Sequence, residues 1–260
     1  MNARQAPGTR QVGEDDVITT RLGAMALPLG VILYVAVTAI FHPHREAPMD
    51  NPAVFMEYAE SDSWVAIHFA QWFAALLLIG GFVALYYSIT TKREANAAVA
   101  RFGLLAAVLT GAGLTMLQAV DGVALKWAVD TWASAPADQE VAAFSAAAAL
   151  RWTEYSLQSF SFILLGLTFI LYGVAIALGT VYPRWLGWVA GGSGVAWIVH
   201  GVMVPYIGLF DSNPRLVAIV LMALWAFIIA VLMWRNSSSG LLSRPESAPP
   251  EPAEPPASPR

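Results

Sequence analysis

Six long runs of apolar residues dominate the pattern of this chain, and short polar segments separate them. A bilayer core of about 30 Å needs roughly 20 helical residues at about 1.5 Å each, and every run meets that length. The pattern predicts an all-α fold, a polytopic membrane helix bundle with six transmembrane helices over residues 22–235. The six runs are residues 22–41, 64–89, 102–124, 155–178, 186–209 and 216–234.

Basic residues gather at one end of the predicted helices. Short connections rich in Lys and Arg stay in the cytoplasm. The sequence therefore predicts that the N and C termini are both cytoplasmic and that the protein is a multi-pass protein of the cell (plasma) membrane. The residues that set this orientation are Arg4, Arg10, Arg21, Lys92, Arg93, Arg101, Arg184, Arg235 and Arg244.

The segments outside the predicted bundle are polar. Residues 1–21 are interpreted as an uncleaved cytoplasmic N-terminal segment, because no small-residue cleavage site follows the first apolar run. Residues 236–260 are rich in Ser, Pro and Glu and are expected to form a disordered cytoplasmic tail. Few lysines beside abundant Ala, Gly and Arg suggest a bacterial source. We expect the lipid bilayer as surroundings, a membrane protein or a second copy as partner, and no nucleic acid.

Two connections on the outer side are longer than turns. Asn51-Pro52 is typical of a helix start, and an apolar face with Val54, Phe55 and Tyr58 follows, which predicts a short interfacial helix. Helix-forming sequence also fills residues 122–154 and predicts an outer helical hairpin. In that hairpin we expect Ser134 to cap a second helix that starts near Pro136.

Polar side chains inside or at the ends of the apolar runs gather toward the outer half of the membrane. An ionisable group in hydrocarbon costs several kcal/mol unless it has a partner or water. Residues three or four apart share a helix face, so these side chains are expected to point into one outward-facing pocket. The candidate pocket residues are Gln71, Gln118, Asp121, Glu154 and Gln158.

All histidines of the chain also fall on this side, at His42, His44, His68 and His200. Imidazole and carboxylate ligands suit a divalent metal such as zinc, iron, copper or manganese, and two histidines on separate helices can hold a haem. The absence of cysteine excludes disulfides and thiolate ligands. In the alternative interpretation, His42 and His44 are solvated, His68 lies one turn below the interface and His200 hydrogen-bonds a neighbouring helix.

The fifth run begins with Pro183-Arg184-Trp185-Leu186-Gly187, and the last run ends with Trp234-Arg235. This segment resembles a large uncharacterised family of bacterial six-helix integral membrane proteins. The resemblance implies six spans and a cell-membrane location, and it assigns no functional residues.

Three classes of function stay open at this point. A metal or haem protein, including a membrane enzyme, accounts for the one-sided His and carboxylate set. A small transporter or a proton or substrate pathway predicts loosened helices, for which Gly80-Gly81 and Gly191-Gly192 are candidates. An accessory scaffold protein needs only helix packing and the outer hairpin.

Overall fold

The computed structural model describes residues 14–42, 51–90, 96–208 and 213–238, and every element in these ranges is helical. Residues 1–13, most of the proline-rich tail and His44 lie outside them. The elements are α1 (Glu14–Ala36), η1 (Val37–Phe41), α2 (Pro52–Glu60), α3 (Trp64–Ile89), α4 (Asn96–Ala119), η2 (Val120–Leu125), α5 (Lys126–Ala133), α6 (Glu140–Leu178), α7 (Arg184–Ile207) and α8 (Asn213–Ser238).

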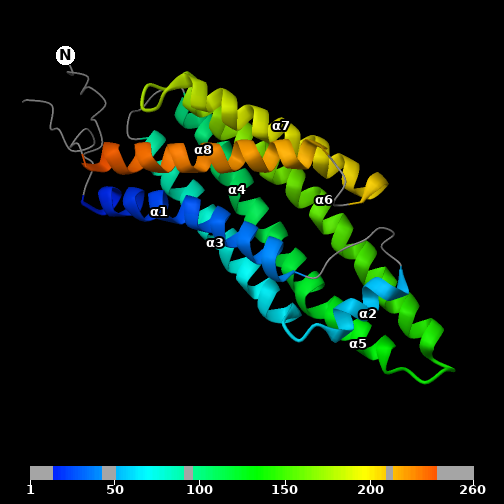
Figure 1. The fold of residues 1–260 in the computed structure, drawn as a ribbon. Helices are drawn as coiled ribbons and strands as arrows, with labels where there is room; N and C mark the ends of the chain where they lie inside the picture. Colours follow the sequence, from blue (N-terminus) through cyan, green and yellow to red (C-terminus); the bar gives the residue numbers. More distant parts are fainter. Residues whose placement is uncertain (1–13, 43–50, 91–95, 209–212, 239–260) are drawn as a thin grey trace, which may run out of the picture.

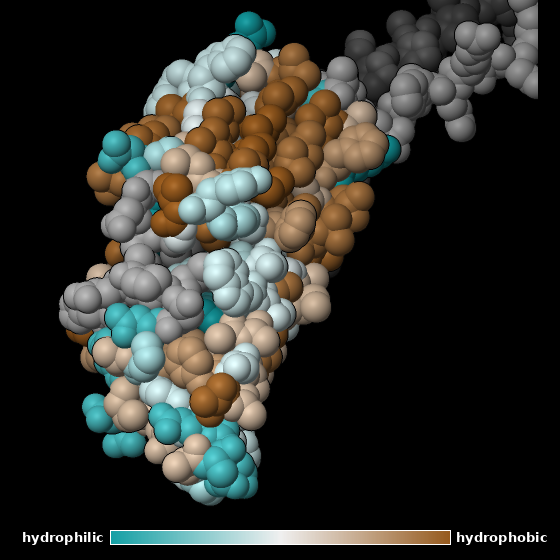
Figure 2. Space-filling view, turned by 90° about the vertical axis from the view of Figure 1, so that its right-hand side faces the viewer, coloured by the Kyte–Doolittle hydropathy of each residue, from teal (hydrophilic) through white to brown (hydrophobic). Residues whose placement is uncertain are grey.

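Six of the helical stretches are long and apolar enough to cross a membrane, which confirms the predicted polytopic membrane bundle. In Figure 2 brown apolar side chains cover the upper part of the molecule, and polar ones become frequent at the lower end, where Figure 1 places α2 and α5. The six stretches are Asp16–Phe41, Trp64–Ile89, Asn96–Ala133, Glu140–Leu178, Arg184–Ile207 and Asn213–Ser238.

The long helices form a closed ring. Around the ring the order is α1, α3, α4, α6, α7 and α8, and α8 packs against α1 to close it, so that α8 lies between α7 and α1 (Figure 1). Arg21 near the start of α1 donates hydrogen bonds to Ser237 and Ser238 at the end of α8. The first and last helices therefore begin and end at the same end of the bundle.

Aromatic side chains fill the part of the ring interior nearer this terminal end. The Phe82 and Tyr172 rings stack with centroids 5.3 Å apart, and the Phe169 and Trp225 rings meet edge to face at 5.2 Å. The Tyr172 hydroxyl donates to the Phe82 carbonyl at 2.8 Å, so its polar atom is paired. The cavity described below lies in the other half of the ring interior, where Phe162 and Trp197 are part of its lining.

Small residues bring α6 and α7 into backbone contact. A Cβ atom placed on Gly166 would lie 2.5 Å from the Gly194 carbonyl oxygen, and one placed on Gly187 would lie 2.4 Å from that of Gly173. Membrane helices associate through such close van der Waals contact because lipid gives no hydrophobic drive between them. The Gly191 amide nitrogen also lies in this contact, 3.0 Å from a Cβ atom placed on Gly173, whereas a Cβ atom on Gly191 itself would meet nothing within 4 Å.

Beyond the ring, α2 and α5 pack on the first turns of α6 and form a second, smaller core, which we call the extension. Asn51 caps α2, because its side-chain oxygen accepts from the Ala53 amide at 2.9 Å, and Pro52 opens the helix as predicted. The expected role of Ser134 is wrong. Ser134 ends α5, and α6 starts later, at Glu140, because the Ser134 hydroxyl bonds back to the Asp130 carbonyl.

Two π-helical segments interrupt otherwise regular helices. One, η1, ends α1 just before His42, and the other, η2, joins α4 to α5 and contains Asp121. Each π turn inserts one extra residue and redirects the side chains that follow, and such turns are frequent at functional sites. In this chain both π segments lie next to the same group of polar residues.

Candidate functional site

The centre of the site is a pair of buried side chains at the junction of the ring and the extension. His68 on α3 is 2% exposed and Asp121 on η2 is 6% exposed. The Nε2 atom of His68 lies 3.0 Å from Oδ2 of Asp121. A Cβ atom on Gly122 would lie 2.4 Å from the His68 Cβ, so the glycine lets η2 approach α3 this closely. The Trp64 indole fixes the approach by donating to the Asp121 carbonyl at 2.9 Å.

The second nitrogen of His68 determines which atom carries the ring proton. Nδ1 lies 2.7 Å from the Trp64 carbonyl oxygen, which can only accept, so Nδ1 must be the protonated nitrogen. In a neutral ring Nε2 then presents a lone pair to a carboxylate oxygen of Asp121. Two acceptors at 3.0 Å repel each other unless a proton or a cation lies between them.

Arg151 on α6 links this pair to a second buried carboxylate. Its guanidinium lies 3.5 Å from Oδ1 of Asp121 and forms an ion pair with Glu154 one turn along the same helix. Glu154 also accepts from the Gln158 amide at 2.5 Å. The sequence prediction placed Glu154 and Gln158 in the pocket and missed Arg151. The spacing of Arg151 three residues before Glu154 is the signal that could have found it.

Aromatic rings enclose the charged group on the side of the extension. Arg151 donates to the Tyr58 hydroxyl at 2.7 Å, and its guanidinium lies 5.1 Å from the ring centroids of Tyr58 and Tyr155. Burial raises the pKa of the Tyr58 hydroxyl well above its usual range, against the opposing effect of Arg151. Tyr58 therefore stays neutral at any physiological pH and accepts the hydrogen bond from Arg151.

His42 completes a group of possible metal ligands. One atom each from His42, His68 and Asp121 lie within 4.8 Å of one another. The His42 ring is 5.2 Å from the rings of both Trp64 and His68. His42 reaches this position because it directly follows η1 at the end of α1, so one ligand comes from each of three separate helical segments.

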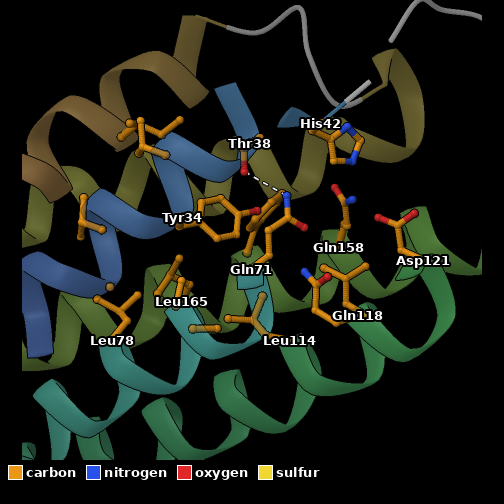
Figure 3. A pocket seen from close by; sticks show the side chains of 18 of the residues that line it. Tyr34, Thr38, His42, Gln71, Leu78, Leu114, Gln118, Asp121, Gln158 and Leu165 are labelled. Carbon is orange, nitrogen blue, oxygen red and sulfur yellow. Dashed lines mark hydrogen bonds between the residues drawn. The ribbon is translucent and has the colours of Figure 1, made fainter. Parts of the chain in front are cut away.

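A cavity of about 280 Å³ lies beside this group, inside the ring. Side chains from all six long helices line it, and His42, Gln71, Gln118, Asp121 and Gln158 face it at one end (Figure 3). Gln71 donates to the Thr38 hydroxyl at 3.0 Å across the cavity wall.

The remaining predicted ligands are placed elsewhere. His200 on α7 is fully buried and packs on the ring of Phe162, with centroids 5.2 Å apart, and on Trp197. It is not a member of the group of His42, His68 and Asp121. The expectation that His68 and His200 face each other as ligands thus receives no support from the grouping of the described residues, and His44 lies outside them.

The fold and the site together define a multi-pass helical membrane protein with a buried His–Asp–Arg–Glu cluster beside an intramembrane cavity. Comparisons of the chain with protein-family models, with curated proteins and with solved structures found no match. The family resemblance of the segment that begins at Pro183 stays a prediction.

Proposed function

We propose that this protein binds a divalent transition-metal ion through His42, His68 and Asp121. The observation that carries the proposal is the contact between Nε2 of His68 and Oδ2 of Asp121, which requires a positive charge or a proton between two acceptors. A metal-bound histidine usually donates its other ring N–H to a carbonyl or carboxylate, and Nδ1 of His68 faces the Trp64 carbonyl in that manner.

The charge of the buried cluster supports a cation. Asp121 and Glu154 bring two negative charges, and Arg151 brings the one permanent positive charge in contact with both. With both carboxylates ionised and the histidines neutral this group carries a net negative charge, and Asp121, Arg151 and Glu154 are each at most 6% exposed. Because an uncompensated buried charge is costly, a bound cation stabilises the cluster.

The ligand set favours a mononuclear site for zinc, iron or manganese over haem. Nitrogen and oxygen ligands suit these ions. His200 packs among aromatic rings and is not a member of the ligand group of His42, His68 and Asp121, so His68 and His200 are not presented together as the two ligands of a haem. Three protein ligands with an open position are typical of catalytic metal sites.

The cavity lies where a molecule could occupy the open coordination position of the metal. Asp121 and His42 line the cavity as well as the ligand group, so a molecule in the cavity can reach the metal. A metal held there would supply a Lewis acid that activates a water or a substrate oxygen. We infer on this basis a membrane metalloenzyme of the plasma membrane, and the transporter and scaffold functions are the alternatives.

Elemental analysis of the detergent-purified protein tests the proposal. After incubation with zinc, iron or manganese and removal of the excess, we expect about one ion per chain for one of them. His68→Ala and Asp121→Asn should each abolish retention. His200→Ala is the matched control, because it removes a buried histidine that lies outside the ligand group, and it should retain the ion.

The absence of any bound metal would favour the alternative function, a proton or substrate pathway. If the wild-type protein retains none of the ions, a proton must occupy the position between His68 and Asp121. The chain of contacts from His68 through Asp121, Arg151 and Glu154 to Gln158 would then favour a proton or substrate pathway.

A further inference from the structure

The cavity inside the ring has a polar end and an apolar end. Figure 3 places Gln118, Asp121, Gln158 and His42 toward one side and Leu78 and Leu165 toward the other. Its volume of about 280 Å³ lies near the lower limit of small-molecule sites, which are roughly 300–1,000 Å³. A site with this shape and lining suits one small molecule that is itself polar at one end.

Apart from Oδ1 of Asp121 and Nε of Arg151, which belong to ion-paired side chains, three polar atoms around this cavity lack a hydrogen-bond partner among the described residues. They are Oε1 of Gln118, Oε1 of Gln158 and Nε1 of Trp197, and their residues are 8%, 6% and 4% exposed. All three residues line the cavity, and they come from α4, α6 and α7. A buried polar atom without a partner costs about 1–3 kcal/mol, so three around one cavity indicate that something else bonds to them.

The chemistry of these atoms defines what the occupant must offer. The amide nitrogen of Gln158 donates to the Glu154 carboxylate, which fixes its oxygen as the atom left over for the cavity. That oxygen accepts only, whereas the Trp197 indole donates only. A hydroxyl group both donates and accepts and so satisfies both kinds of atom. A ketone or an ether offers no donor.

Part of the cavity lining lies on the exposed apolar side of α1. Val35 on α1 lines the cavity and is 41% exposed. Its neighbours on the exposed face of α1 are apolar, among them Ile32 at 49% exposed. A molecule that enters here comes from the hydrocarbon phase.

We propose that the cavity binds a small single-chain amphiphile with a hydroxyl-bearing head, taken from the bilayer. The head hydroxyls bond to Gln118, Gln158 and Trp197, and the chain lies among Leu78, Leu114 and Leu165. The bound head lies next to Asp121 and hence next to the ligand group. This inference rests on the cavity and does not depend on the metal.

A photo-crosslinking experiment in phosphatidylcholine nanodiscs tests it. The probe is 1,2-decanediol with a diazirine in its chain, and labelled residues are mapped by mass spectrometry. We expect labels on the cavity-facing residues of α3, α4 and α6. Unlabelled 1,2-decanediol should compete about tenfold better than 1,2-dimethoxydecane, which has the same chain without O–H donors, since a buried hydrogen bond is worth about one power of ten in affinity.

One set of variants tests the contacts of the head, and a second set tests the route by which the amphiphile enters the cavity. Gln118→Met and Gln158→Met keep the side-chain volume, remove the acceptor and should erase the difference between the two competitors. Val35→Trp should block labelling by closing the mouth, whereas Ile32→Trp, on the same lipid-facing side of α1 and not part of the cavity lining, should leave it unchanged.

Two results would overturn the proposal. Labels confined to lipid-facing side chains would mean that the polar atoms meet water only. Equal competition by 1,2-decanediol and 1,2-dimethoxydecane in the wild-type protein would mean that the hydroxyls of the head make no hydrogen bond to the cavity. The labelling is repeated after EDTA treatment. Labelling that persists without metal supports the amphiphile site whether or not the protein binds a metal ion.

Discussion

Arg151 connects more parts of the site than any other single side chain described here. Its guanidinium contacts Asp121 and Glu154, donates to Tyr58 at 2.7 Å and lies over the rings of Tyr58 and Tyr155. Those contacts come from α2, η2 and α6 itself. Arg151 therefore determines both the charge of the cluster and the attachment of the extension to the ring.

Replacing Arg151 by Met is expected to destabilise the protein by about 3–5 kcal/mol, because two buried carboxylates lose their only permanent cation. Unfolding by SDS titration measures the change. The double variant Arg151→Met/Glu154→Gln should recover part of the loss, since it removes one of the stranded charges.

Asp130→Asn is the matched control for this prediction. It breaks the Lys126–Asp130 ion pair, in which Asp130 is 49% exposed, and should cost less than about 1 kcal/mol. Equal losses for Arg151→Met and Asp130→Asn would contradict the central role of Arg151.

For single residues, the sequence predicts which polar side chains lie in the site but not the side chains with which they pair. The apolar runs make Gln71, Gln118, Asp121, Glu154 and Gln158 conspicuous, and the structure places all of them on the cavity wall. Arg151 and Tyr58 lie outside the apolar runs, where a charged or aromatic side chain is ordinary. The spacing of Arg151 before Glu154 and the apolar face that includes Tyr58 are visible in the sequence, but neither shows that the two side chains meet. Their role arises only when α2 folds against α6.

Among the elements, the π-helical segment η2 has the most direct effect on the site. It contains Asp121 and Gly122, and the glycine is what allows His68 and Asp121 to meet. Such a turn has no composition of its own, because it differs from an α-helix by one residue in the hydrogen-bond pattern. The sequence therefore predicts the long helices from their length but gives no sign of η1 or η2.

Gly122→Ala is expected to weaken metal binding without removing a ligand. The new Cβ would lie 2.4 Å from the His68 Cβ, which cannot turn away as a flexible side-chain end can, so η2 must shift. We expect a loss of stability of about 1–3 kcal/mol and metal affinity at least about tenfold lower.

Gly191→Ala provides the comparison, because a Cβ there meets nothing within 4 Å and should change stability by less than about 0.5 kcal/mol. Metal titration and SDS unfolding of both variants measure the effects. Unchanged metal affinity in Gly122→Ala would argue against ligation by His68 and Asp121 together.

The whole molecule combines a ring of six membrane helices with an extension at one end, and the site lies where the two meet. The six membrane helices follow from the apolar runs, whereas their order around the ring is a finding of the structure. The position of the site does not follow from the apolar runs, because it depends on the return of α2 and α5 onto α6. The orientation of this assembly in the membrane stays a prediction from the distribution of Lys and Arg.

Tag accessibility tests that orientation. A tag after Arg260 should stay inaccessible in intact spheroplasts, and a tag inserted at Ala137, an exposed residue between α5 and α6, should be labelled from outside. Permeabilised cells, in which both tags should react, are the control. The reverse pattern would place the extension and the site in the cytoplasm.

Because η2 contains one extra residue, the protein is expected to be unusually sensitive to a deletion of one codon at this point. A single-codon deletion within residues 120–125 would restore a regular α-helix and rotate everything after it by about 100° about the helix axis. Leu125, Val129 and Trp132 would then leave the small core of the extension. The deletion of one codon here would therefore separate the extension from the ring in a single mutational step.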